Sequence, residues 1–246
     1  MKAMILAAGL GTRLRPLTDT RPKALVEISG RTLLEITLSR LREVGVRDVI
    51  VNVHHFAGMV ESWLKANHNF GMGIELSRED DLLLDTGGGL KKAAWFFLND
   101  AASSEDEPFI LHNVDVVSTI DLARMLQYHE QHQALATLAV QKRQTSRYLL
   151  FDDDLALCGR RAAQGREELA ASSPAHALAF AGIHVISPRL LRLMNEEGVF
   201  SIIDCYLRLA KEGERILGFP ADEYYWRDLG RPENVKRAAE EPNSKT

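Results

Sequence analysis

The sequence predicts an α/β fold: a Rossmann-like, doubly wound, mixed but mainly parallel sheet with a small hairpin or lid region. Short apolar, β-branched segments alternate with amphipathic helical segments through the first half of the chain. The first apolar segment runs into a loop that holds Gly9 and Gly11, where a parallel sheet places its binding site. The 246 residues contain no internal repeat or linker, so we expect one domain over 1–240 and a flexible tail at 241–246.

The elements of the first half follow from hydrophobic periodicity. Strands are indicated by short β-branched runs, and helices by apolar residues that recur every three or four positions. The expected strands are 2–7, 48–53, 73–77, 109–112 and 134–140, and the expected helices are 32–44, 57–66, 88–97 and 121–132. Asp121 is typical of a helix N-cap.

The pattern changes after residue 142. Residues 147–151 and 155–158 flank an acidic turn and predict a hairpin, and the polar, weakly periodic segment 159–176 predicts a loop or lid. The remaining expected strands are 177–186 and 215–219, and the remaining expected helices are 188–195, 201–211 and 232–240.

The composition excludes several classes of function. A net charge of −4 gives no electrostatic reason to propose nucleic-acid binding. No apolar run reaches the ~18 residues that a membrane span needs. Cys158 and Cys205 lack the spacing of a disulfide framework or a metal site, which favours the reducing cytoplasm. We therefore expect a cytoplasmic protein without nucleic-acid or membrane partners.

The loop after the first strand carries glycines and cations together. Glycines let backbone N–H groups approach a phosphate oxygen, because no Cβ intervenes. Arg13, Arg15 and Lys23 follow closely and would neutralise phosphate charge. The segment predicts a triphosphate site, against the alternative of a glycine turn with basic residues on a solvated face.

The motif LAAGLGTRLRPLT…PKAL resembles the signature of the sugar-1-phosphate nucleotidylyltransferases, also called NDP-sugar pyrophosphorylases. The resemblance implies that Arg13 is a catalytic residue facing the β/γ end of the triphosphate, and that Lys23 is a catalytic residue bridging to the α-phosphate. It also implies a nucleotide-binding loop, consisting of Ala7, Ala8, Gly9, Gly11 and Thr12 together with these two cations.

Two aspartates resemble the metal ligands of this family. Asp115 ends the strand FILHNVD, where a carboxylate can hold Mg²⁺, although it could instead cap a helix near Thr119. This chain has Asn113-Val114-Asp115 where the family pattern is Asn-Gly-Asp. Asp228, in YYWRDLGRPENV, resembles the family's second ligand; a strand ended by Gly230 and a helix opened by Pro232 explain the Gly and Pro but not the Asp.

The segment Asp85-Thr86-Gly87-Gly88-Gly89-Leu90 precedes the helix expected at 88–97. Three consecutive glycines cost much chain entropy, and they would let a flat base lie against the backbone. The resemblance implies that Thr86, Gly87, Gly88 and Asn113 bind the nucleotide. An acidic residue followed by Thr-Gly-Gly-Gly is most similar to the N-acetylmuramate 1-phosphate uridylyltransferases within the family.

The sugar-phosphate residues are expected in the second half of the chain. Gly182 resembles the family's glycine that touches sugar hydroxyls, and Asp204 could accept from a hydroxyl. The family's Glu-Lys-Pro element is missing, so Arg147 is our preferred cation for the sugar phosphate, with Lys142 and the pair Arg160-Arg161 as alternatives. Each of these cations could equally be a solvated surface charge.

The resemblance implies a Mg²⁺-dependent enzyme that converts a nucleoside triphosphate and a sugar 1-phosphate to an NDP-sugar and pyrophosphate. Residues 1–140 would form the nucleotide-binding half and 141–230 the sugar-phosphate-binding half of a monomer or homodimer. UTP with N-acetylmuramate 1-phosphate is the preferred pair. The alternatives are a mannose- or heptose-1-phosphate guanylyltransferase, a phosphocholine cytidylyltransferase, and a non-catalytic nucleotide-sugar sensor.

Overall fold

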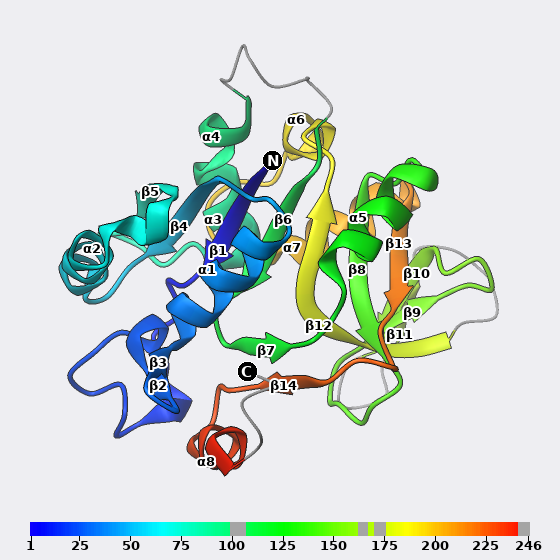
Figure 1. Ribbon diagram of the computed structural model, residues 1–246. Helices are drawn as coiled ribbons and strands as arrows, with labels where there is room; N and C mark the ends of the chain where they lie inside the picture. Colours follow the sequence, from blue (N-terminus) through cyan, green and yellow to red (C-terminus); the bar gives the residue numbers. More distant parts are fainter. Residues whose placement is uncertain (99–106, 162–166, 170–175, 241–246) are drawn as a thin grey trace.

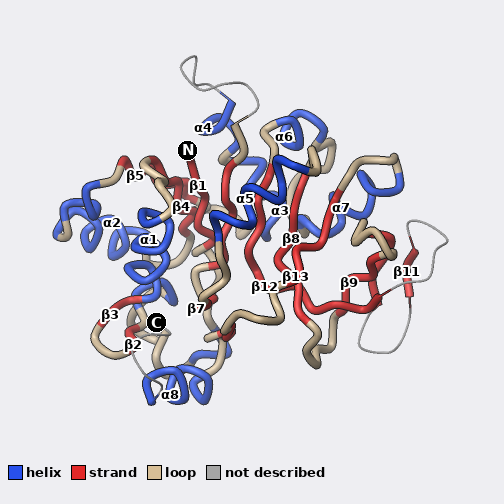
Figure 2. The backbone as a smooth tube through the Cα atoms, turned by 45° about the vertical axis from the view of Figure 1, so that its right-hand side comes forward, coloured by secondary structure: helices blue, strands red, loops and turns tan. Residues whose placement is uncertain are grey.

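The fold is built on a mixed sheet that has helices on both faces, as the sequence predicted (Figures 1 and 2). The computed structural model describes residues 1–98, 107–161, 167–169 and 176–240. The expected tail at 241–246, and 162–166 and 170–175 of the expected lid, lie outside the described residues. No helix in the described ranges has the length and hydropathy needed to cross a membrane.

Ten strands form the central sheet in the described part of the chain. They are β1 (Lys2–Leu6), β4 (Asp48–Val53), β5 (Gly73–Arg78), β6 (Phe109–Asn113), β8 (Ala136–Gln141), β9 (Tyr148–Phe151), β10 (Leu157–Arg161), β11 (Glu167–Leu169), β12 (His176–Ile186) and β13 (Ile216–Pro220). β1 pairs in parallel with β4 and β6, β4 pairs in parallel with β5, and β8 pairs in parallel with β13. β12 runs antiparallel to β6, β8 and β9 and joins the parallel half to the hairpin half.

Two hydrophobic cores, one on each face of the sheet, explain the near-continuous apolar strands. Successive side chains of a strand point to opposite faces. Ala3 and Ile5 of β1 therefore pack in one core, and Met4 packs in the other. The first core is covered by α1 (Leu33–Glu43), α2 (Ala57–Ala66) and α5 (Leu122–Gln131). The second is covered by α3 (Asp85–Lys92), α4 (Ala94–Leu98), α6 (Arg189–Leu193) and α7 (Ile202–Lys211).

Six of the seven expected helices begin within one residue of their predicted starts, and side chains cap three of them. The Thr32 hydroxyl caps α1 by accepting from the Glu35 N–H at 3.1 Å. The Asp121 carboxylate caps α5 by accepting from the Arg124 N–H at 2.9 Å. The Ser201 hydroxyl caps α7.

Two short ladders were not predicted. β2 (Glu27–Ile28) pairs with β3 (Arg31–Thr32), and β7 (Val116–Ser118) pairs with β14 (Trp226–Asp228) just before α8 (Pro232–Glu240). Figure 1 shows β7 and β14 side by side beyond the end of β6. Strands of two or three residues are too short for an alternating pattern to be read from sequence.

The expected helix at 88–97 is confirmed as helical over most of its length but is wrong in its start and continuity, because the helix begins at Asp85 and is divided at Ala93. The glycines lie inside α3 because this helix packs closely against the segment before α7. A Cβ on Gly87 would lie 2.3 Å from the Phe200 ring, and one on Gly88 would lie 2.4 Å from the Gly198 carbonyl oxygen. The expected loop at 159–176 is also partly wrong, because β10 extends to Arg161 by pairing with β9 through a bulge.

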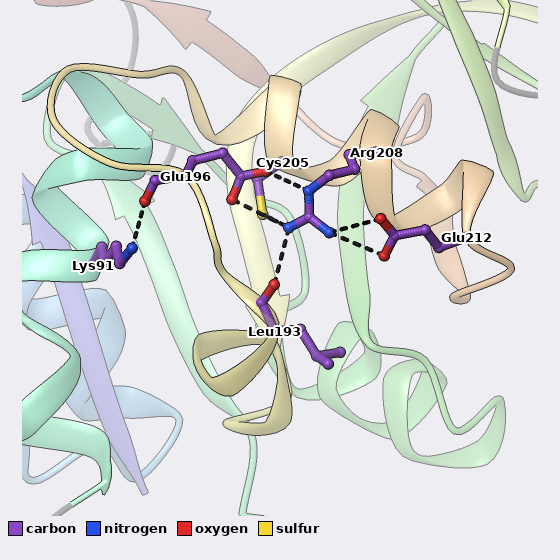
Figure 3. Close-up of polar contacts among 6 residues, drawn as sticks. All are labelled: Lys91, Leu193, Glu196, Cys205, Arg208 and Glu212. Carbon is purple, nitrogen blue, oxygen red and sulfur yellow. Dashed lines mark hydrogen bonds and ion pairs between the residues drawn. The ribbon is translucent and has the colours of Figure 1, made fainter.

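The segment that packs on α3 is fixed by Arg208 of α7. Figure 3 shows the Arg208 guanidinium between the carboxylates of Glu196 and Glu212. Arg208 Nε donates to Glu196 Oε1 at 2.7 Å. Nη2 also donates to the Leu193 carbonyl at 2.9 Å, and Lys91 of α3 donates to the Glu196 carbonyl at 2.5 Å. Burial raises the pKa of the neighbouring Cys205 thiol to about 12, so this cysteine stays protonated and is not a nucleophile.

The buried histidines predict how stability changes with pH. Burial lowers the pKa of His112 and His184 to about 3 and that of His129 to about 4. Below pH 6.5 these histidines bind protons in the unfolded chain but stay neutral in the folded chain. Their contribution to the free energy of unfolding is therefore fully present above pH 6.5 and is lost as the pH falls towards 4. Each such histidine adds about 1.4 kcal/mol per pH unit to the slope of the free energy of unfolding against pH in that range.

We expect His184→Gln to reduce the pH dependence of the free energy of urea unfolding by about one such increment between pH 6.5 and 5. The exposed His55→Gln is the matched control and should leave the slope unchanged. Equal slopes in wild type and His184→Gln would contradict the assignment of a neutral buried imidazole.

Candidate active site

The β7–β14 ladder brings the two predicted metal ligands together. Asp115 directly precedes β7, and Asp228, the last residue of β14, is opposite Val116 in the ladder. The Leu229 N–H donates to the Asp115 carbonyl at 2.8 Å and locks this register. Asp115 caps no helix, since Asp121 caps α5. The alternative reading of Asp115 as a cap is therefore wrong.

Two cavities meet at this ladder. The larger, of about 1050 Å³, lies towards β9, β10 and β12, and the smaller, of about 410 Å³, lies between the β1 loop and the start of α3. Asn113 and Asp115 line both cavities, whereas Asp228 lines only the larger one. A reaction between a molecule in each cavity would therefore take place beside Asp115.

The predicted glycine loop contributes to the smaller cavity only in part. Ala7, Ala8 and Gly9 line it, while Gly11 and Thr12 belong to a turn beside it. The Gly11 carbonyl accepts from the Thr18 hydroxyl at 2.8 Å. A Cβ on Gly9 would meet no atom within 4 Å, so this is the point of the loop where a ligand can come close to the backbone.

The two predicted catalytic cations lie on opposite sides of Asp115. Lys23 lines the smaller cavity, and its ammonium forms a partly buried ion pair with the Asp115 carboxylate. Arg13 lines the larger cavity near Asp228, and a Cβ on Gly230 would lie 2.9 Å from its guanidinium. The structure thus gathers both cations and both carboxylates around one point.

The predicted base-binding residues are largely engaged in hydrogen bonds and packing with other parts of the protein. Thr86 lines the smaller cavity, but its hydroxyl accepts from the Ile202 N–H at 3.0 Å. The Gly87 N–H donates to the Phe200 carbonyl at 3.0 Å, and Gly87 and Gly88 pack against 198–202. Leu83 and Val199, which the sequence analysis did not select, also line this cavity.

On the sugar side, Gly182 and Asn113 are packed together. Gly182 has φ +78° at a bulge in β12, and a Cβ there would lie 2.9 Å from Asn113 Nδ2. Both residues line the larger cavity. The glycine is therefore needed both for its backbone conformation and for the position of the Asn113 amide.

The larger cavity is rich in arginine. Among the described residues it is lined by Arg13, Arg143, Arg147, Arg160 and Arg161. The predicted Arg147 is exposed at the start of the hairpin, whereas the predicted Asp204 binds Arg160 at 2.5 Å and does not line the cavity. Arg143, which was missed, stacks 3.8 Å above the Trp226 ring and donates to the Phe180 carbonyl at 2.7 Å. Its Nε is buried without a partner among the described residues.

The comparison with known proteins decides the family. The model of the family described as "Nucleotidyl transferase" matches residues 2–244. The chain belongs to this nucleotidyl transferase family. It is a sugar-1-phosphate nucleotidylyltransferase, as the resemblance in its sequence predicted.

Two similar relatives of this nucleotidylyltransferase differ in the activity that their names state. An N-acetylmuramate alpha-1-phosphate uridylyltransferase of Caulobacter vibrioides is 35% identical, over 97% of this chain and 95% of its own length. A mannose-1-phosphate guanylyltransferase catalytic subunit beta of Danio rerio is 31% identical, over 95% of this chain and 62% of its own length.

Solved structures confirm the fold of the nucleotidylyltransferase. HddC from Yersinia pseudotuberculosis, complexed with GMP-PN, has a TM-score of 0.75 at 22% identity and covers 97% of this chain and 98% of its own. A UDP-glucose pyrophosphorylase complexed with UDP-glucose has a TM-score of 0.76 at 17% identity and covers 97% of each chain.

The donor set fits the expected Mg²⁺. Mg²⁺ is usually held by one or two carboxylates, with phosphate oxygens and water completing its shell. Asp115 and Asp228 supply two such carboxylates at one cavity. No group of three or more His, Cys, Asp or Glu side chains suited to a metal occurs in the described ranges.

The packing of Gly182 against Asn113 gives a testable prediction. We expect Gly182→Ala to destabilise this nucleotidylyltransferase by about 2 kcal/mol more than Gly45→Ala, because the added methyl group would also overpack the Asn113 amide. Gly45 is the matched control, with φ +86° and open space around it. Urea unfolding measures both. Equal losses would contradict the contact with Asn113.

Proposed function

We propose that this nucleotidylyltransferase catalyses the Mg²⁺-dependent reaction of UTP with N-acetylmuramate 1-phosphate to give the UDP-sugar and pyrophosphate. The observation that carries the proposal is the junction of the two cavities at Asp115, with a cation on each side. The smaller cavity would take the nucleotide, and the larger would take the sugar 1-phosphate.

In this reaction an oxygen of the sugar phosphate attacks the α-phosphorus of the nucleotide. The new P–O bond forms as the bond to the bridging α–β oxygen breaks, and pyrophosphate leaves with that electron pair. The nucleophile is already anionic near neutral pH, so no general base is required. No histidine is found among the described residues that line the two cavities, which agrees with this chemistry.

Positioning and charge neutralisation would then supply the catalysis. Lys23 would stabilise negative charge at the α-phosphate. The role of Arg13 at the departing pyrophosphate, which the family resemblance implies, requires the β/γ end of the triphosphate to reach past Asp115 to the edge of the larger cavity, which Arg13 lines. Asp115 and Asp228 would hold Mg²⁺, which supplies further neutralisation of the transferring phosphoryl group when bound. The Lys23–Asp115 ion pair supports this role, since it keeps the ammonium at the junction of the cavities.

The charge of the larger cavity supports an acidic sugar. N-acetylmuramate 1-phosphate carries a carboxylate in addition to its phosphate, and arginine is suited to both anions. Arg143 stacks on Trp226 of β14, the strand that ends at Asp228. Burial lowers the pKa of its guanidinium, and the charge of Asp228 opposes this effect. We assign the sugar phosphate to Arg143, in place of the Arg147 preferred from the sequence, and the carboxylate to Arg147, which is exposed and lines the same cavity.

The relatives support two different nucleoside triphosphates as the substrate. The Caulobacter vibrioides uridylyltransferase matches this chain over 95% of its own length, which favours UTP. The Danio rerio guanylyltransferase supports the second candidate, GTP with a mannose or heptose 1-phosphate.

A screen of pyrophosphate release with four nucleoside triphosphates against a panel of sugar 1-phosphates tests the proposal. We expect UTP with N-acetylmuramate 1-phosphate to give the highest kcat/KM. N-acetylglucosamine 1-phosphate, which lacks the carboxylate, should be a poorer acceptor by about tenfold or more, the value of one hydrogen bond to a charged group.

The variant Arg147→Gln should lose this preference for the acidic sugar, and Arg192→Gln, on α6 and lining neither cavity, is the matched control. Preference for GTP with mannose 1-phosphate would overturn the proposed substrates and favour the second candidate. Absence of release with every pair would overturn the proposed reaction.

A further inference from the structure

One buried amide connects the β1 loop to the rest of the smaller cavity. Asn52, near the end of β4, accepts with its side-chain oxygen from the N–H of Ala7 at 2.7 Å and from that of Ala8 at 3.3 Å. The Asn52 side chain is buried and lines the cavity. These two backbone N–H groups are therefore held by the protein and are not available to a phosphate.

The other end of the amide is held by a buried carboxylate. Asn52 Nδ2 donates to Glu79 Oε1 at 2.7 Å, and Glu79 Oε2 accepts from the Leu84 N–H at 2.9 Å. Glu79 is only 1% exposed. Because a carboxylate only accepts hydrogen bonds, Glu79 forces the Asn52 NH₂ group towards itself and the Asn52 oxygen towards Ala7 and Ala8.

A third segment, α3, packs against Asn52 and Glu79. Gly89 of α3 lies so near that a Cβ there would be 2.8 Å from Asn52 Nδ2 and 2.9 Å from Glu79 Oε1. The pair thus connects the loop at Ala7–Ala8, the loop before Leu84 and the first turns of α3. Ala7 and Ala8, Leu83, and Asp85 and Thr86 from these segments line the smaller cavity.

We propose that Asn52 and Glu79 are positioning residues for the nucleotide, which fix the spacing between the β1 loop and the wall from Leu83 to Thr86. The inference rests on the proposed use of the smaller cavity by the nucleotide. It depends on neither the base nor the sugar. A buried hydrogen-bond chain of this kind has a single satisfied arrangement, and any mismatch in it moves a wall of the cavity.

Exchanging the amide at position 52 and the carboxylate at position 79, singly and together, tests this chain of hydrogen-bond donors and acceptors. In Asn52→Asp, two carboxylates face each other. In Glu79→Gln, the new NH₂ group must face either the Leu84 N–H or the Asn52 NH₂ group, unless Asn52 turns and presents its NH₂ to Ala7.

The double variant, Asn52→Asp with Glu79→Gln, reverses the direction of the central hydrogen bond. The carboxylate introduced at position 52 accepts from the N–H groups of Ala7 and Ala8 and from the amide introduced at position 79. The oxygen of that amide accepts from the Leu84 N–H. All the hydrogen bonds and the net charge are then restored.

The measurement is the Kd of the folded protein for UTP and for GTP by titration calorimetry, together with the KM of each substrate. For the triphosphate that the wild type binds more tightly, we expect Asn52→Asp and Glu79→Gln to raise Kd and KM at least fivefold. The double variant should return both to within twofold of wild type. The KM of the sugar 1-phosphate should stay within twofold throughout.

The control for a general loss of stability is Thr137→Val, which removes the buried hydrogen bond between Thr137 and His129 on another part of the sheet. It should lower the melting temperature without changing the nucleotide Kd. If Asn52→Asp does not fold, Glu79→Gln decides by itself. A nucleotide Kd within twofold of wild type in Glu79→Gln, or no rescue in the double variant, would overturn the proposal. A preference for GTP would overturn the proposed base and leave this inference standing.

Discussion

The three-residue ladder between β7 and β14 is the constraint on which the site depends. It joins two segments that are far apart in the chain and sets Asp228 opposite Val116, beside Asp115. The partly buried guanidinium of Arg40 in α1 anchors β7 by donating to the Ser118 side chain at 2.6 Å and to the Ile120 carbonyl at 2.6 Å. The Trp226 indole anchors β14 by donating to the Ala181 carbonyl at 2.7 Å. The ladder is therefore fixed to one helix and to β12, and these partly buried hydrogen bonds help to place the two carboxylates.

The two cavities meet at Asn113 and Asp115, directly before β7 of this ladder. Asp115 is shared by both, Lys23 binds it from the smaller one, and the arginines line the larger one. The bulge of β12 at Gly182 and the stacking of Arg143 on Trp226 shape the larger cavity around β14. A transfer reaction between two anionic molecules needs this arrangement, since their charges must be neutralised at the point where they meet.

The sequence predicted the alternating elements well, because long apolar strands buried on both faces and capped helices such as α1 and α5 leave clear patterns. It did not predict β7, β14 or the start of α3, because these depend on contacts between distant segments. Only the family resemblance connected Asp115 with Asp228, since spacing carries no such information. Arg143, Asn52 and Glu79 were missed for a similar reason: each is a single polar residue whose role comes from partners elsewhere in the chain. A polar residue near the end of the buried strand DVIVNV was the one available signal for Asn52.

The central claim is that Asp115 and Asp228 hold one divalent ion beside the nucleotide. Its most direct test is the Kd of Mn²⁺, a paramagnetic replacement for Mg²⁺, measured in the presence of a non-hydrolysable UTP analogue. We predict that Asp228→Asn weakens Mn²⁺ binding about tenfold or more, as Asp115→Asn does, although the two residues are distant in sequence. A wild-type Kd for Mn²⁺ in Asp228→Asn would contradict the account.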